Sequence, residues 1–163
     1  MIDFGGFEAG VQVATLWRDG CSRIPDVKGV YAVLFPDGLQ PSFLGRSPAG
    51  HFKGKDPTLT IMELQERWVA GTSIIYIGQA GGRRGERDSR ATLRKRLRQL
   101  LDYGAGKPVG HEGGRALWQI SEATDFLIRW RQLPDADPCI VETRMIAEFK
   151  EQFGKRPYAN KRD

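Results

Sequence analysis

The sequence predicts a small α/β (α+β) domain in which a central three-stranded sheet is flanked by helices. Three short runs rich in β-branched and aromatic residues predict the strands, at 29–35, 73–79 and 126–133. Two longer segments, 90–103 and 137–153, carry apolar residues at helical spacing. Strands and helices in this order pack most simply as one sheet covered by helices.

The length and composition indicate one folded domain. The 163 residues, 40% hydrophobic and 28% charged, are typical of a single globular domain, and no repeat or charged linker divides residues 1–163. No apolar run approaches the length of a membrane helix, and residues 1–10 lack the basic start of a signal peptide. The protein is therefore expected to be cytoplasmic, with no membrane partner.

The first predicted strand is followed by a long stretch rich in glycine and proline. Residues 36–55 contain both residue types repeatedly, which predicts a surface loop. A short helical pattern at 58–68 leads from this loop into the second strand. The segment between the first two strands is thus long and only partly regular.

The two long helices have clear sequence signals. The segment 90–103 has leucines at helical spacing, namely Leu93, Leu97, Leu100 and Leu101. The last helix opens with Asp137-Pro138, a capping residue followed by proline at the first helical position. Gly154 is expected to end that helix after about residue 153.

Positive charge is concentrated on and before the first long helix. The net charge is +5, and the block between 83 and 98 holds Arg83, Arg84, Arg87, Arg90, Arg94, Lys95, Arg96 and Arg98. Such a block contacts phosphates in nucleic-acid-binding proteins, or else forms a solvated helix face. We assign phosphate contacts to Arg83, Arg84, Arg90, Arg94, Lys95 and Arg98. The expected partner is nucleic acid.

Short motifs on these elements resemble those of the GIY-YIG nuclease superfamily. In chain order they are Gly29-Val30-Tyr31, Tyr76-Ile77-Gly78, Leu93-Arg94-Lys95-Arg96-Leu97, a glutamate on the last helix and Asn160. Each motif is weak alone, but their order over most of the chain is specific. The resemblance implies a GIY-YIG-like fold in which residues 36–72 are an insertion between the two tripeptides.

The resemblance also implies one active site and a reaction. It places Tyr31, Tyr76, Arg96, Glu142 and Asn160 together in a metal-dependent endonuclease that hydrolyses phosphodiester bonds. DNA is the favoured substrate, and the choice between DNA and RNA stays open. A carboxylate can hold one Mg²⁺ or Mn²⁺ ion at a phosphate, which is the role expected for Glu142. A guanidinium can stabilise charge on the phosphate, and a phenol beside cations can accept a proton.

Two assignments within this site have sequence-level alternatives. Tyr31 is the first choice as general base, with Tyr76 orienting the water or the phosphate, and the reverse stays open. Arg94 and Arg96 flank the leucine stripe about equally, so periodicity does not separate them, and the family pattern favours Arg96. His111 is a further candidate, because it lies in the glycine-rich segment 110–115 after the basic helix, where a loop could close over substrate.

The glutamate is chosen by the geometry of its helix. At roughly 100° per residue, Glu142 falls near the middle of the apolar stripe formed by Val141, Met145, Ile146, Phe149 and Phe153, and Glu148 falls at its edge. A carboxylate on a buried face needs a compensating cation.

Two rival functions are weighed against this interpretation. Pro134-Asp135 followed by Glu142 loosely imitates a PD-(D/E)xK nuclease, but that site needs its glutamate on a strand, whereas Glu142 is predicted to be helical. A GIY-YIG-derived module that binds nucleic acid without cutting it is the second rival. The sequence leaves the oligomeric state and the restriction, repair or mobile-element role open.

Overall fold

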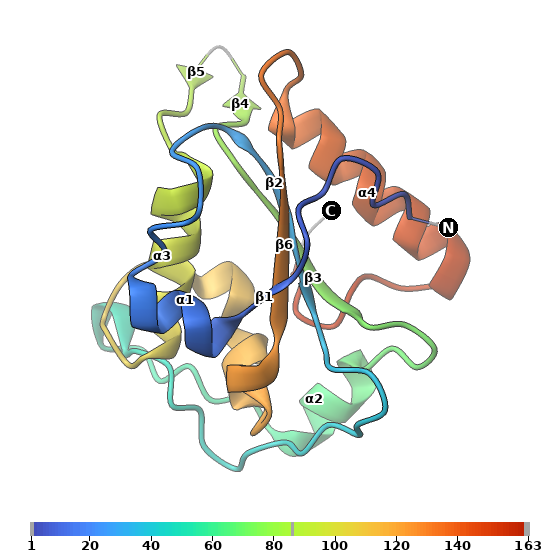
Figure 1. Ribbon diagram of the computed structural model, residues 1–163. Helices are drawn as coiled ribbons and strands as arrows, with labels where there is room; N and C mark the ends of the chain where they lie inside the picture. The colour runs from blue at the N-terminus through green and yellow to red at the C-terminus, as the bar shows by residue number, and fades with distance from the viewer. Residues whose placement is uncertain (1, 86, 162–163) are drawn as a thin grey trace.

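The fold is built on a four-stranded antiparallel sheet (Figure 1). The computed structural model describes residues 2–85 and 87–161, except for the side chains of Arg84, Asp88 and Glu112. The strands are β1 (Val11–Gln12), β2 (Gly29–Leu34), β3 (Ile74–Ala80) and β6 (Leu127–Gln132), in the order β1-β6-β2-β3. The predicted strands at 29–35, 73–79 and 126–133 are therefore confirmed.

The prediction of a three-stranded sheet is wrong, because β1 adds a fourth strand. Val11 and Gln12 pair with Ile128 and Leu127 of β6. A strand of two residues is too short to show an alternating pattern, so β1 could not be predicted from the sequence. A separate two-stranded hairpin, formed by β4 (Arg83–Arg84) and β5 (Arg87–Asp88), follows β3.

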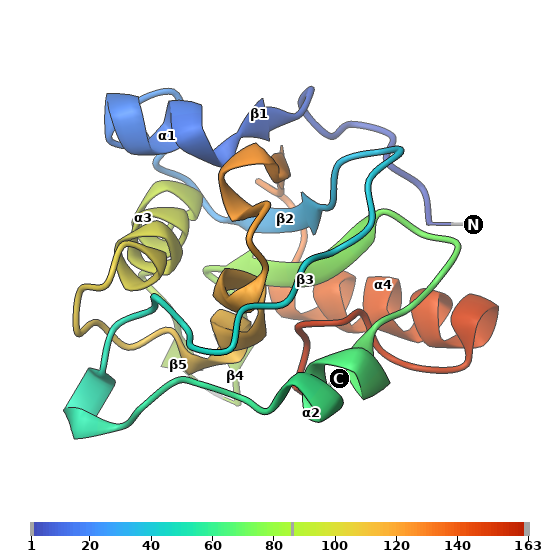
Figure 2. The same ribbon diagram turned by 90° about the horizontal axis from the view of Figure 1, so that it is seen from below.

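Helices cover both faces of the sheet (Figures 1 and 2). The α-helices are α1 (Val13–Asp19), α2 (Ile61–Arg67), α3 (Leu93–Gly104) and α4 (Pro138–Phe153), with short 3-10 turns η1 (Phe52–Gly54), η2 (Glu112–Gln119) and η3 (Ala123–Asp125). α1 and α3 lie on one face, and α4 lies on the other. None of the helices within 2–85 and 87–161 is long and apolar enough to cross a membrane.

The helix ends follow from their capping residues. The Asp137 side chain accepts a hydrogen bond from the Cys139 amide at the start of α4, and Gly154 ends the helix with a φ of 78°. Both predicted ends of this helix are confirmed. α3 begins at Leu93 instead of residue 90, because the Thr92 side chain caps it by accepting from the Lys95 amide.

Side chains along β2 and β3 point alternately to the two faces of the sheet, so the hydrophobic core consists of two clusters, one on each face. Tyr31 and Tyr76 belong to the cluster under α1 and α3, whereas Val30 and Ile77 pack with Met145 and its neighbours on α4. Side chains alternate faces along a strand, so both tyrosines of the two tripeptides point to the α3 side.

The segment between β2 and β3 is held in place by Gln119, a buried residue of η2. The Gln119 amide oxygen accepts from the Leu59 amide at 2.8 Å, and its nitrogen donates to the carbonyls of Leu44 and Leu59, each at 2.7 Å. The Gly50 amide also donates to the carbonyl of Tyr103 at the end of α3. The predicted surface loop at 36–55 is therefore confirmed, because most of its residues are exposed, and hydrogen bonds from Leu44 and Gly50 tie it to η2 and α3.

Candidate active site

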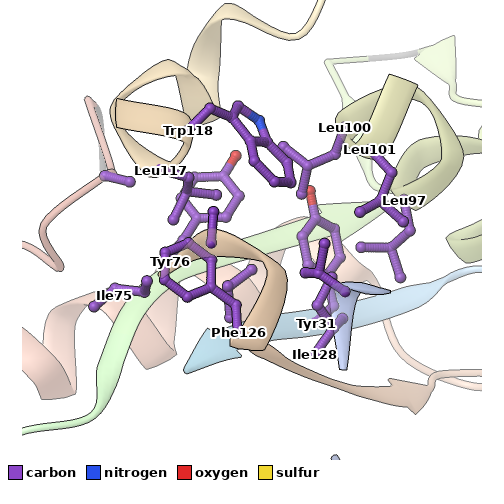
Figure 3. Packing of buried hydrophobic residues seen from close by; sticks show 14 of the residues in the cluster. Tyr31, Ile75, Tyr76, Leu97, Leu100, Leu101, Leu117, Trp118, Phe126 and Ile128 are labelled. Atoms are coloured by element: carbon purple, nitrogen blue, oxygen red, sulfur yellow. The ribbon is translucent and has the colours of Figure 1, made fainter. Parts of the chain in front are cut away.

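Tyr31 and Tyr76 form a pair on neighbouring strands. Tyr31 lies opposite Gly78, and Tyr76 lies opposite Val33, so the two rings occupy adjacent rows of one face. Their ring centroids are 6.0 Å apart. Both hydroxyl groups point toward Trp118 and Leu100 (Figure 3).

The glycines of the two tripeptides make room for this pair. A Cβ atom at Gly78 would collide with the Tyr31 ring, and one at Gly29 would collide with the carbonyl of Arg131 on the neighbouring strand. A Cβ at Gly113 would lie 3.2 Å from the Tyr76 hydroxyl. Both tripeptides therefore need glycine at these positions, because any side chain there would collide with a neighbouring strand or with the Tyr31 ring.

Burial dominates the proton affinity of both phenols. Tyr31 is 0% exposed and Tyr76 is 6% exposed. Burial raises the pKa of Tyr31 well above 10 and that of Tyr76 to about 12. The contact between the two phenols adds to the rise in the pKa of Tyr31 and opposes the rise in the pKa of Tyr76.

Two opposite charges act on the phenols. The Arg96 guanidinium lowers the pKa of both tyrosines, and the Glu142 carboxylate raises it. Arg96 comes from α3 and Glu142 from α4, on opposite faces of the sheet. Both charges nevertheless lie within electrostatic reach of the two hydroxyl groups.

His111 lies against the tyrosine pair. Its Nε2 atom is 3.4 Å from the Tyr31 hydroxyl, and its ring centroid is 6.4 Å from that of Tyr76. The residue is 1% exposed, and its Nδ1 atom has no hydrogen-bond partner among the described residues. Burial, and then the charge of Arg96, lower its pKa to about 3, so the ring is neutral at physiological pH.

This burial makes the free energy of unfolding depend on pH. Because the folded pKa of His111 lies below the unfolded value of 6.5, its stability contribution is complete above pH 6.5 and is lost as pH falls. We expect the free energy of unfolding to drop by about 1 kcal/mol per pH unit between about pH 6 and 5. Urea titrations of wild type and His111→Gln would measure this drop. An equal drop in the variant would assign it to another group.

Arg96 lines two adjoining hollows on the basic side of the molecule. One hollow is lined by residues 79–82, Arg87, Ser89 and Ala91, and the other by Arg90, Lys95, Arg98 and Gln99. Arg96 itself is half-buried and donates to the Gln99 side chain at 3.0 Å. Arg96 therefore lowers the pKa of the two phenols and also lines an accessible basic surface.

The basic block divides into exposed and structural members. Exposed side chains are those of Arg83, Arg87, Arg90, Lys95 and Arg98, and the Arg84 side chain lies outside the described part. Arg94 differs, because its guanidinium donates to the carbonyls of Ile24 at 2.7 Å and Ser22 at 3.4 Å. These bonds tie α3 to the segment before β2, a role that helical periodicity does not reveal.

Glu142 and Glu148 have different environments. Glu142 is partly buried and Glu148 is exposed, while Met145, Ile146 and Phe149 form the buried face of α4. No cluster of three or more His, Cys, Asp or Glu side chains suited to a metal forms within 2–85 and 87–161. One carboxylate fits Mg²⁺, which usually keeps several waters and shares its remaining positions with substrate phosphates.

The Asn160 side chain binds the segment that follows α4 to β3, next to Tyr76. Its side-chain oxygen accepts from the Ile77 amide at 3.0 Å, and its nitrogen donates to the Ile77 carbonyl at 2.8 Å. The Ala159 amide donates to the Ile75 carbonyl at 2.8 Å. Asn160 therefore ties the segment after α4 to β3, at the residue that follows Tyr76.

The cover over the phenols is the part that the sequence analysis missed. Trp118 and Leu117 from η2 and Leu100 from α3 lie over the two hydroxyl groups (Figure 3). Trp118 stacks on Trp17 of α1 at 5.5 Å, and Gly104 leaves room for its ring. The sequence signal for this cover is the glycine-rich segment 110–115, which is expected to be a loop over the substrate, whereas the structure places its residues from 112 on in η2.

The chain matches no protein-family model, no curated protein and no solved structure.

Proposed function

We propose that the protein is a metal-dependent endonuclease of the GIY-YIG type that hydrolyses phosphodiester bonds in the cytoplasm, with DNA as the preferred substrate. One observation carries the proposal. The residues were chosen from sequence motifs on separate elements: the rings of Tyr31 and Tyr76 lie 6.0 Å apart, and the charges of Arg96 and Glu142 both act on the pKa of these two phenols. A chance resemblance would not be expected to gather them.

The side chains have distinct roles in this proposal. Arg96 faces the basic hollows and would stabilise the negative charge that builds up on the phosphate. Tyr76, in its phenolate form, would accept the proton of the attacking water, since its side chain is 6% exposed whereas that of Tyr31 is completely buried. Glu142 would hold one Mg²⁺ or Mn²⁺ ion, which when bound polarises the phosphate and stabilises the leaving oxygen.

A specific observation favours a second candidate function. Both phenols are almost completely covered, so they reach a phosphate only if η2 moves away from them. A domain that keeps this cover would bind nucleic acid through its basic surface and leave it intact. The second candidate is therefore a GIY-YIG-derived binding module without nuclease activity.

A cleavage screen separates the two functions. Supercoiled DNA, flapped DNA and structured RNA would be incubated with the protein and Mg²⁺ or Mn²⁺, with EDTA as the control, and the ends mapped. Metal-dependent cuts in DNA support the nuclease. Substrates that are bound but stay intact with both ions support the binding module.

Binding in either case should depend steeply on salt. Each neutralised phosphate releases counterions, so Arg98→Ala should reduce the slope of log affinity against log salt by about one unit. Arg94→Ala should leave the slope unchanged and lower the free energy of unfolding by about 1–3 kcal/mol, because it removes bonds to two carbonyls. Fluorescence anisotropy and urea titration measure the two effects. An affinity indifferent to salt would contradict the proposal.

A further inference from the structure

A further basic hollow, apart from the two that Arg96 lines, lies between α2 and the C-terminal segment. Arg67 at the end of α2 lines it together with Lys155, Arg156 and Lys161, and Glu66 is the acidic residue in its lining. Lys155, Arg156 and Lys161 are exposed. The hollow thus gathers positive charge from two segments about 90 positions apart, outside the basic block that the sequence analysis identified.

The cationic side chains are oriented by backbone acceptors. The Lys155 ammonium donates to the carbonyl of Glu66 at 3.0 Å, which joins the C-terminal segment to α2. The Arg156 guanidinium donates to the carbonyl of Lys161 at 3.3 Å. Both bonds are to backbone carbonyls, so they fix the positions of these two side chains beside the hollow.

This further hollow lies next to the candidate active site along β3. Asn160 lines it, and the same side chain pairs with both backbone groups of Ile77, directly after Tyr76. The hollow that contains Arg96 is lined by Gln79 and the residues after it. Ile77 and Gln79 are about 7 Å apart along a strand. Two of the basic hollows therefore border the same strand, one through Asn160, which is bonded to Ile77, and the other through Gln79.

We propose that the hollow lined by Arg67, Lys155, Arg156 and Lys161 is a second phosphate-binding subsite, which holds the nucleic-acid backbone beyond the candidate active site. This inference rests on the proposed function. A nucleic-acid strand carries a phosphate about every 3.4 Å along the axis of the duplex, so one backbone passing along β3 presents phosphates to both hollows. The insertion then has a role in binding, because α2 supplies Arg67 and the carbonyl that orients Lys155.

The test is a salt titration of DNA binding with matched variants. Wild type, Lys155→Gln/Arg156→Gln and the control Arg18→Gln/Arg46→Gln would bind a fluorescein-labelled DNA duplex in EDTA, followed by anisotropy. The control removes the same charge from exposed residues outside the hollow. We expect the first variant to reduce the salt slope by about one to two units, and the control to keep the wild-type slope.

The outcomes separate this inference from the proposed function. A wild-type slope in Lys155→Gln/Arg156→Gln, or an equal reduction in the control, overturns the subsite while the nuclease proposal stands. Expected slopes with DNA that is never cut support the subsite and remove the nuclease proposal. A wild-type protein that binds no nucleic acid overturns both.

Discussion

Tyr76→Phe is expected to slow metal-dependent cleavage of DNA by about 10²–10⁴-fold while leaving DNA binding intact, because losing a general base costs roughly that factor. The change removes one oxygen atom from a side chain that is 6% exposed, and it keeps the ring that packs beside Tyr31. Tyr31→Phe should cost less, since Tyr31 is completely buried and its hydroxyl lies 3.4 Å from His111 Nε2.

The pH dependence of the rate gives an independent measurement. With the pKa of Tyr76 raised to about 12, the phenolate fraction increases about tenfold per pH unit below that value. The logarithm of kcat should therefore rise with a slope near one between about pH 7 and 9 in wild type and lose this slope in Tyr76→Phe. A slope that is lost in Tyr31→Phe and kept in Tyr76→Phe would return the base to Tyr31.

Local signals in the sequence account for most of the predicted elements. β2 and β3 are short β-rich runs between turn residues, and α4 has a capping aspartate, a proline and a terminal glycine that define both ends. β1 and α1 gave no such signal. α1 is seven residues long. Its residues Val13 and Leu16 are fully buried in a cluster that also contains residues of α3 and η2, and no local sequence pattern encodes such distant contacts.

The candidate site shows the same division between local and distant causes. Tyr31, Tyr76 and Arg96 could be selected because short motifs mark them. The proximity of His111 to Tyr31 could not be derived, since the two residues are 80 positions apart. Gln119, which holds the insertion through Leu44 and Leu59, is likewise an ordinary polar residue in the sequence, and only the fold shows that it is buried.

Glu142→Gln is expected to abolish metal-dependent cleavage while the fold is retained. The amide is nearly isosteric with the carboxylate but lacks the charge that holds a hard divalent ion. The partly buried position of Glu142 supports this choice, and so does its effect on both phenols. DNA binding in EDTA should persist, because the basic hollows do not include Glu142.

Glu148→Gln is the matched control, because it makes the same substitution six positions later on the same helix. Spacing back from Asn160 would favour Glu148 as the ligand, but Glu148 is exposed, whereas Glu142 is partly buried and its charge reaches the phenols. Cleavage rates would be compared over a Mn²⁺ titration, because a weakened site can be refilled at high metal concentration. We expect Glu148→Gln to match wild type and Glu142→Gln to stay inactive at saturating Mn²⁺. If Glu148→Gln is dead and Glu142→Gln is active, the metal is held on the outer face of α4, and the role given to the tyrosine pair beside Glu142 is wrong.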